Sequence, residues 1–176
     1  MYSHNVSISL SQLMRQLVLK PDQPLVKAPV LLWEAPPSES SPDEDWAPTD
    51  AGFKTRPTAS DPLVFVIEKV PGRPNPFAMG VTVGRVESND VIVDDGSVSR
   101  FHAWLQFEAR QKHWWLCDAE SKNGTFLGAQ RLTPNQKVQL TDGARIKFGE
   151  ALMQFLMPDS LVKTIRDRSG GYGSKR

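Results

Sequence analysis

The chain has 176 residues, of which 39% are hydrophobic, which is enough for the core of one domain or at most of two small domains. Its formal net charge of +1 gives no overall field toward nucleic acid or anionic lipid, and no apolar run is long enough to cross a bilayer. The single cysteine, Cys117, excludes a disulfide framework and a cysteine-rich metal site.

The N-terminal 61 residues divide into a helical segment and a polar linker. Ser9 and Gln12 have capping-box spacing, and the following apolar residues recur on one face, which predicts a short amphipathic helix within residues 1–20. This helix either packs on its own domain or docks on a partner, and an apolar patch at 30–33 allows the same two interpretations. Residues 21–61 are rich in proline, serine and acidic residues, which predicts a mostly disordered linker. Without a signal peptide at the N-terminus, we expect a cytoplasmic protein with no membrane or nucleic-acid partner and no metal.

From residue 62 the sequence consists of short β-branched and apolar runs separated by turn residues. This pattern is typical of strands, and no long helical period appears up to residue 158. We therefore expect an all-β sandwich or barrel over 62–158, followed by a flexible, basic, glycine-rich tail over 159–176. The predicted strands lie at 63–70, 79–85, 90–95, 102–110, 112–118, 125–132, 136–140, 144–149 and 151–157.

Three polar turns between the predicted strands, at 84–90, 95–102 and 118–125, carry the candidate site. Alternate loops of a sandwich gather at one end, which would bring cations, a hydroxyl and an amide onto one surface. Guanidinium groups bind phosphate oxygens bidentately, and hydroxyl and amide donors can complete the shell. The residues concerned are Arg85, Ser99, Arg100, Lys122 and Asn123.

Ser99, His102 and Asp118 allow a competing interpretation, a catalytic serine with its histidine base. However, Ser99 lacks the strand–nucleophile–helix pattern of hydrolases, and it is too close in sequence to His102 to resemble known triads. A histidine at the start of a strand is more typical of a buried structural residue. The residues favour binding over catalysis, and we expect no enzyme activity.

The order and spacing of these residues resemble those of the forkhead-associated (FHA) domain. The resemblance rests on the motifs Ser-Arg-x-His and Ser-x-Asn-Gly-Thr, which follow a Gly-Arg pair in the sequence. It covers roughly residues 62–158. It implies an FHA-type β-sandwich of about eleven strands whose loops at one end bind phosphothreonine peptides. It also implies a signalling adaptor, of the bacterial single-domain kind, that binds a Ser/Thr kinase or its substrate. The matching residues are Gly84-Arg85, Asn89, Ser99–His102, Asp118, Ser121–Thr125, Asp142-Gly143 and Phe148-Gly149.

The resemblance also implies a role for each residue of the turns. Arg85 and Ser99 would hold the phosphate, with Arg100 and Lys122 beside it, and Asn123 would pair with the peptide backbone. Ser97 and Val98 lie where family members read a residue that follows the phosphothreonine, and without an arginine there we expect no acidic preference. Loop-shaping roles are implied for Gly84, Asn89, His102, Asp118, Ser121, Gly124 and Thr125.

Two further possibilities stay open at this stage. The same sandwich could act as a scaffold that binds partners independently of phosphate. Alternatively, Thr49, Thr55 or Thr58 of the linker could be phosphorylated and enter a binding site, rather than lying in an unmodified spacer. The resemblance places the chain termini at the end away from the binding loops. A phosphorylated linker would then reach the site of another copy and give head-to-tail association.

Overall fold

The computed structural model describes residues 7–20, 23–34, 57, 61–72, 77–78 and 80–170. Within these ranges the elements are α1 (Leu10–Leu19), α2 (Pro158–Gly170), β1 (Ile8–Ser9), β2 (Val30–Trp33), β3 (Leu63–Val66), β4 (Val81–Gly84), β5 (Val91–Ile92), β6 (Ala103–Glu108), β7 (His113–Asp118), β8 (Thr125–Leu127), β9 (Gln130–Arg131), β10 (Lys137–Leu140), β11 (Arg145–Phe148) and β12 (Ala151–Leu156).

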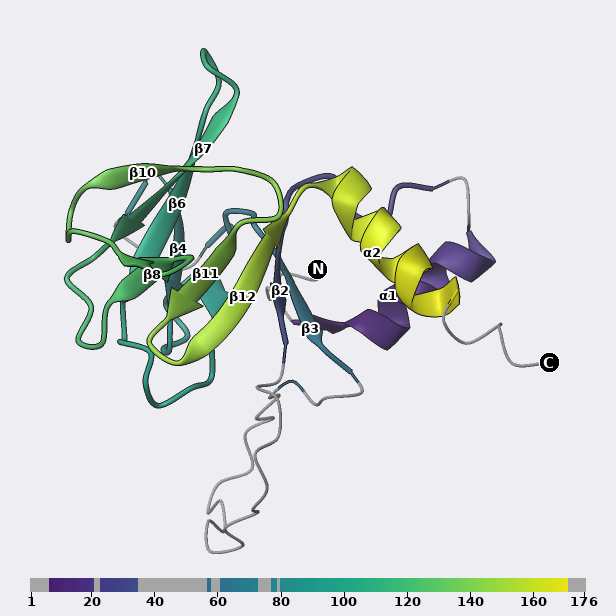
Figure 1. Cartoon of the computed structure of the whole chain (residues 1–176), viewed down its shortest axis with the longest axis horizontal. Coiled ribbons are helices and arrows are strands. Elements are labelled where there is room, and N and C mark those ends of the chain that lie inside the picture. Colours follow the sequence, from purple (N-terminus) through teal and green to yellow (C-terminus); the bar gives the residue numbers. More distant parts are fainter. Residues whose placement is uncertain are drawn as a thin grey trace, which may run out of the picture.

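The strands form two sheets that pack face to face (Figure 1). One has the order β1-β3-β2-β12-β11-β8-β9 and the other the order β10-β7-β6-β4-β5. Apolar side chains from both sheets, among them Leu105, Leu116, Ile146 and Phe148, form the main core between them. The predicted all-β sandwich is confirmed, because alternating strands such as β6 bury one face against the opposite sheet.

Strand β2 lies inside the range that was predicted to be linker. It pairs with β12 through Trp33 and Met153, and with β3 through Trp33 and Leu63. All four of its residues are buried: Leu31 and Trp33 belong to the main core, and Val30 and Leu32 to a second core. A strand covered on both faces has a continuous apolar sequence, so periodicity could not distinguish it from an isolated apolar patch.

The second core lies between the helices and the outer face of β2, β3 and β12 (Figure 1). The predicted helix is confirmed as α1, and Ser9 and Gln12 form both bonds of the capping box. Leu13 is fully buried in this core together with Leu161 of α2. Of the two interpretations of the N-terminal helix, the structure therefore has the one in which it packs on its own domain.

The flexible tail that was predicted over 159–176 is wrong for the residues up to 170, which belong to helix α2. Pro158 occupies the first turn, and Asp142 accepts hydrogen bonds from the Met157 amide (2.8 Å) and the Ser160 hydroxyl (2.5 Å). Leu161 and its neighbour one turn later, Ile165, are fully buried. A few apolar residues among many polar and charged ones give a weak sequence pattern, and the burial of Leu161 and Ile165 against α1 and the sheet stabilises the helix. Residues 171–176 lie outside the described ranges.

The three polar turns lie at one end of the sandwich, and β2 ends and β3 begins at that same end. The Glu150 amide donates to the Ser97 hydroxyl (2.8 Å), and the chain enters β12 directly afterwards, close to where Met153 pairs with Trp33. Figure 1 shows teal loops and the ends of β2 and β3 together on the lower side of the molecule. The linker therefore does not join the sandwich away from the loops, because β3 runs antiparallel to β2 and starts from the loop end.

Candidate functional site

Three loops meet in one open groove at this end of the sandwich. Arg85 comes from the loop after β4, Ser99 and Arg100 from the segment before β6, and Lys122 and Asn123 from the loop between β7 and β8. All five residues that were predicted to bind the phosphate or the peptide backbone line this groove. The sandwich topology thus brings together three cations, a hydroxyl and an amide that are far apart in sequence.

Hydrogen bonds tie the three loops to one another at Ser97 and Ser99. The Arg85 amide donates to the Ser99 carbonyl (3.0 Å), and the Lys122 amide donates to the Ser99 hydroxyl oxygen (3.0 Å). The Asn123 side-chain amide donates to the Ser97 carbonyl (2.7 Å). The relative positions of the cations are therefore set by backbone contacts.

The Ser99 hydroxyl is placed to donate a hydrogen bond to a ligand and not to act as a nucleophile. Its oxygen accepts the Lys122 amide, and a serine hydroxyl retains one hydrogen that it can donate to a ligand in the groove. The contact between Ser99 and His102 joins the Ser99 backbone amide to Nδ1 of the ring (3.0 Å) and does not involve the hydroxyl. The arrangement of a nucleophile and its base, which the Ser99–His102–Asp118 interpretation requires, is not present.

His102 is a fully buried ring that links two of the loops. Because the Ser99 amide can only donate, Nδ1 is an acceptor, and the hydrogen is on Nε2, which donates to the Gly124 carbonyl (3.2 Å). Burial lowers the pKa of His102 below its ordinary value, against the raising effects of this hydrogen bond and of Asp118. The neutral ring also packs edge-on against Phe148, with centroids 5.7 Å apart.

Two buried polar residues shape the backbone of the loops. Asp118 accepts hydrogen bonds from the hydroxyls of Ser121 and Thr125, each at 2.6 Å, and from the Ser121 amide at 3.1 Å. The Asn89 side chain donates to the Arg100 carbonyl (2.6 Å) and to a carbonyl of its own loop (2.9 Å). Each contact holds a segment that carries one of the groove residues.

Two glycines are required by close approach of the chain. A Cβ on Gly84 would lie 2.3 Å from the Arg100 carbonyl oxygen and 2.6 Å from the Asn89 side-chain nitrogen. Gly124 has a φ of +86°, which favours glycine, and a Cβ there would lie 2.6 Å from Nε of Arg131. Gly84 lets its loop approach the segment that carries Arg100, and Gly124 supplies the positive φ of the loop after β7.

Val98 lines the groove without an exposed side chain. It is 1% exposed and belongs to the main core, and its role in specificity stays a prediction. Ser97 also lines the groove, but its hydroxyl donates to Asp95 (2.6 Å) and accepts the Glu150 amide (2.8 Å). This serine is held by its own loop and by the hairpin that precedes β12.

Sequence reasoning missed Phe101, which lines the groove with 40% of its side chain exposed. A lone aromatic residue between Arg100 and His102 resembles an ordinary strand residue, and only its position beside the groove sets it apart. Glu120 of the loop after β7 also lines the groove and was not singled out. It accepts a hydrogen bond from the Asn135 side chain (2.7 Å).

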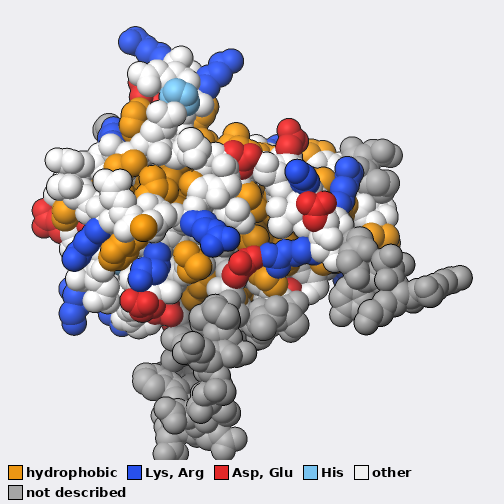
Figure 2. All heavy atoms as spheres, viewed as in Figure 1, with side chains coloured by type: hydrophobic (Ala, Val, Ile, Leu, Met, Phe, Trp, Pro, Cys, Tyr) orange, Lys and Arg blue, Asp and Glu red, His pale blue; other side chains and the backbone are white. Residues whose placement is uncertain are grey.

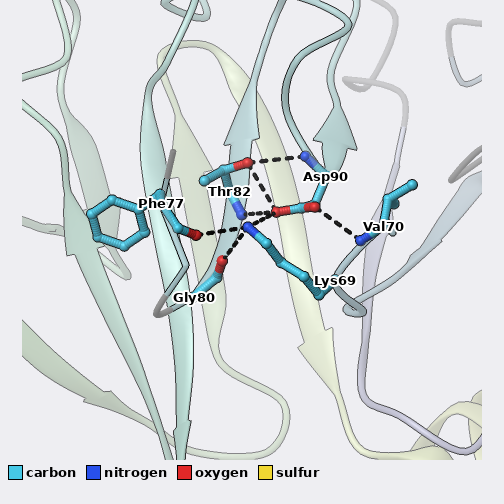
Figure 3. A network of polar contacts seen from close by, with 6 residues as sticks. All are labelled: Lys69, Val70, Phe77, Gly80, Thr82 and Asp90. Carbon is cyan, nitrogen blue, oxygen red and sulfur yellow. Dashed lines mark hydrogen bonds and ion pairs between the residues drawn. The ribbon is translucent and has the colours of Figure 1, made fainter. Parts of the chain in front are cut away.

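An ion pair between the exposed Lys69 and the buried Asp90 was also missed (Figure 3). The side chain of Asp90 has no exposed surface, and its Oδ2 accepts Lys69 Nζ (2.9 Å), the Thr82 amide (2.8 Å) and the Thr82 hydroxyl (3.0 Å). Burial raises the pKa of Asp90, but the hydrogen bonds from Thr82, Val70 and Lys69 outweigh it, so the pKa lies below the ordinary value. Lys69 and Asp90 are distant in sequence and belong to no motif, so no pattern pointed to their pairing.

Charges of both signs are interspersed over the face shown in Figure 2, and Lys or Arg side chains stand at the tip of the projecting β6–β7 hairpin. Neither helix within the described ranges is long and apolar enough to span a membrane. Among the same residues, no group of three or more His, Cys, Asp or Glu side chains is placed to hold a metal ion.

A family model for the FHA domain matches residues 81–149, the segment that supplies every residue of the groove. Residues 81–149 form an FHA domain. The chain is 36% identical over 114 residues to an FHA domain-containing protein of Arabidopsis thaliana, a match that covers 61% of this chain and 29% of that protein. It is 31% identical over 87 residues to the nuclear inhibitor of protein phosphatase 1 of Homo sapiens, covering 47% of this chain and 25% of that protein.

The chain thus spans under a third of the length of these two relatives. Among solved structures it is similar to an FHA domain described in a structural and functional analysis of phosphothreonine-dependent FHA domain interactions. That match has a TM-score of 0.47 and 18% sequence identity, and it covers 74% of this chain and 97% of the other. The FHA domain of the present chain carries its groove on the loops after β4, before β6 and after β7.

Proposed function

We propose that the groove of this FHA domain binds a phosphothreonine side chain of a partner protein. The observation that carries the proposal is the convergence of three cations, Arg85, Arg100 and Lys122, with Ser99 and Asn123 in one groove. The chain is then an interaction module whose binding depends on a phosphate that a kinase has added elsewhere.

The negative charge of phosphothreonine explains why cationic and hydroxyl side chains are suited to bind it. A phosphothreonine carries about −1.5 to −2 charges and three strong acceptor oxygens, whereas an unmodified threonine offers a guanidinium nothing to pair with. Arg85 pairs with two phosphate oxygens, Lys122 adds a point charge, and the Ser99 hydroxyl donates its hydrogen. Each charge-assisted hydrogen bond contributes roughly 1.5–3 kcal/mol, so discrimination between the two forms of the peptide is large.

Asn123 is suited to hold the peptide backbone beside the phosphate. Its side-chain nitrogen already donates to the Ser97 carbonyl, which fixes the plane of the amide. The amide oxygen can then accept from a backbone N–H of the peptide, as the acceptor capacity of asparagine allows. The same residue thereby joins the loop that holds the phosphate to the backbone of the ligand.

At the level of the cell, we propose a signalling adaptor that acts in the cytoplasm downstream of a Ser/Thr kinase. The partner is the kinase itself or one of its substrates, provided that it carries phosphothreonine. This role follows from the chemistry of a groove that recognises the product of such a kinase.

The proposal is tested with a library of phosphothreonine peptides and the variant Arg85→Ala. We expect the wild-type chain to bind phosphothreonine peptides. The affinity of Arg85→Ala should be at least tenfold lower, because one bidentate ion pair is removed. Arg110→Ala is the control, since Arg110 is an exposed arginine in the β6–β7 turn and does not line the groove. Equal affinity for phosphorylated and unmodified peptides would contradict the proposal and favour a phosphate-independent scaffold.

We also propose that a phosphorylated linker threonine competes for the groove. Thr49, Thr55 and Thr58 lie outside the described residues, but they belong to the segment between Trp33 and Leu63, which are paired near the loop end of the sheet. An extended chain spans about 3.3 Å per residue, so both the groove of the same chain and that of a second copy are within reach. The site on another copy gives head-to-tail association.

Phosphorylating the chain at these threonines with a Ser/Thr kinase tests the competition. We expect weaker binding of an added phosphothreonine peptide, and alanine at all three positions should abolish this effect. A molar mass that rises with concentration would identify binding between copies, and a constant monomer mass would identify binding within one chain. Unchanged peptide affinity after stoichiometric phosphorylation would contradict the competition.

A further inference from the structure

An aromatic ring stands beside the cations of the groove. Phe101 follows Arg100 directly and is 40% exposed, and no other large apolar side chain among the described lining residues is exposed. We infer that Phe101 is a specificity residue that contacts an apolar side chain of the bound phosphothreonine peptide. This inference rests on the proposed function, since it concerns what the same groove selects next to the phosphate.

Phe101 is backed by two further rings. Its ring centroid lies 5.9 Å from that of Phe77, and Phe77 lies 4.9 Å from Trp104 of β6, with interplanar angles of 51° and 48°. Tilted aromatic pairs at such distances contribute about 0.5–1.5 kcal/mol beyond the area they bury. Lys137 Nζ lies 5.2 Å from the centroid of the Trp104 ring and extends the row. The exposed ring is therefore the end of a packed row rather than an isolated surface residue.

The ion pair between Lys69 and Asp90 holds the backbone that carries the middle ring of this row. Lys69 Nζ donates to the Phe77 carbonyl (2.8 Å) and to the Gly80 carbonyl (2.9 Å), while it pairs with the buried Asp90. Figure 3 shows the Phe77 ring pointing away from this ion pair. Because the backbone of Phe77 is anchored, the surface against which Phe101 rests is already formed before a peptide binds. A preformed contact surface loses less conformational entropy on binding.

The chemistry of the groove selects an apolar partner for this ring. Arg100 and Phe101 are consecutive residues, and both line the same groove. A peptide whose phosphate is held by the cations of this groove then has the exposed ring within reach of a residue that neighbours the phosphothreonine. A lysine or arginine at that point finds no net negative charge, because Arg85, Arg100 and Lys122 balance the bound phosphate and the single lining carboxylate, Glu120. A phenyl ring offers no hydrogen-bond donor to an acidic side chain. Leucine, isoleucine or phenylalanine, in contrast, buries apolar area against the ring.

The test uses phosphothreonine peptides with serine at all flanking positions, in which leucine is placed at one position at a time. For the wild-type chain we expect one leucine position to tighten binding by about tenfold, the effect of one well-packed apolar contact. Phe101→Ala should abolish this gain, so that the leucine peptide and the all-serine peptide bind this variant with equal affinity. Phe107→Ala is the matched control, because Phe107 is 48% exposed on β6, packs against Trp114 and does not line the groove.

Three outcomes would overturn the inference. The first is a wild-type chain that binds the all-serine phosphopeptide and gains nothing from leucine at any position, which leaves the proposed function intact. The second is a leucine gain that survives Phe101→Ala and the polar variant Phe101→Gln, both checked for folding by circular dichroism. The third is a chain that binds no phosphothreonine peptide at all, which removes the proposed function and the inference together.

Discussion

At the scale of single residues, the groove depends on a glycine whose missing side chain lets two backbone segments come into close contact. Gly84 is the tightest of these positions, because a Cβ there would meet the Arg100 carbonyl oxygen at 2.3 Å. Gly84→Ala should therefore destabilise the fold by about 1–3 kcal/mol and weaken peptide binding, since the loop that carries Arg100 must move. Gly96→Ala is the control, as nothing lies within 4 Å of its added Cβ. Thermal unfolding of both variants checks the prediction, and equal melting temperatures would contradict it.

His102 should give a pH dependence to stability. Its pKa in the folded chain is lowered by burial, whereas in the unfolded chain the ring takes up a proton near its ordinary value of 6.5. Between these two values the unfolded state binds more protons, so unfolding is favoured as the pH falls. The stabilisation is complete above about pH 6.5 and is lost as the pH falls through the lowered pKa.

Urea unfolding between pH 7.5 and pH 5 measures this effect. We expect His102→Gln to lose this part of the pH slope, and also to be destabilised by about 2–4 kcal/mol because the Gly124 carbonyl and the Ser99 amide lose a buried partner. His113→Gln is the control, since this histidine lies in β7 outside the groove. An unchanged slope in the His102 variant would show that the ring does not titrate differently in the two states.

At the scale of elements, strand β2 determines where the folded unit begins. It lies between β3 and β12, and its side chains enter both cores. We propose that the folding unit includes α1, β2 and α2 in addition to residues 62–158. A chain that starts at residue 61 should therefore unfold at much lower urea concentration than the full chain, because β12, β3 and α2 lose their apolar cover.

A matched deletion separates the strand from the segment that follows it. Replacing residues 36–59 by a short glycine-serine turn keeps β2 and β3, which are antiparallel neighbours that a short turn can join. This variant should unfold close to the full chain. A chain starting at residue 61 that is as stable as the full chain would contradict the structural role of β2.

Most elements could be predicted from the sequence because each has a local cause. The runs at 102–110 and 112–118 alternate or carry β-branched and aromatic residues next to turn residues, and they became β6 and β7. The run at 125–132 divided at its glycine into β8 and β9. Strand β2 and helix α2 could not be assigned from local patterns, because their apolar residues are explained only by the partners against which they pack.

At the scale of the whole molecule, recognition depends on a local groove rather than on overall charge. The net charge is +1, and the cations that matter lie in three loops which the two sheets hold at one end. The motif residues could be predicted because their spacing is fixed by short strands. Phe101 and the ion pair between Lys69 and Asp90 could not, because their contacts join segments that no motif connects.

The central claim is that the groove binds phosphate on threonine, and amide chemical-shift mapping tests it most directly. A phosphothreonine peptide and its unphosphorylated twin are titrated separately into the isotope-labelled full chain. We expect the phosphorylated peptide to shift the amide signals of four groove residues, and the unphosphorylated peptide to leave them unchanged. These residues are Arg85, Ser99, Lys122 and Asn123. Shifts at another surface, or equal shifts with both peptides, would contradict it.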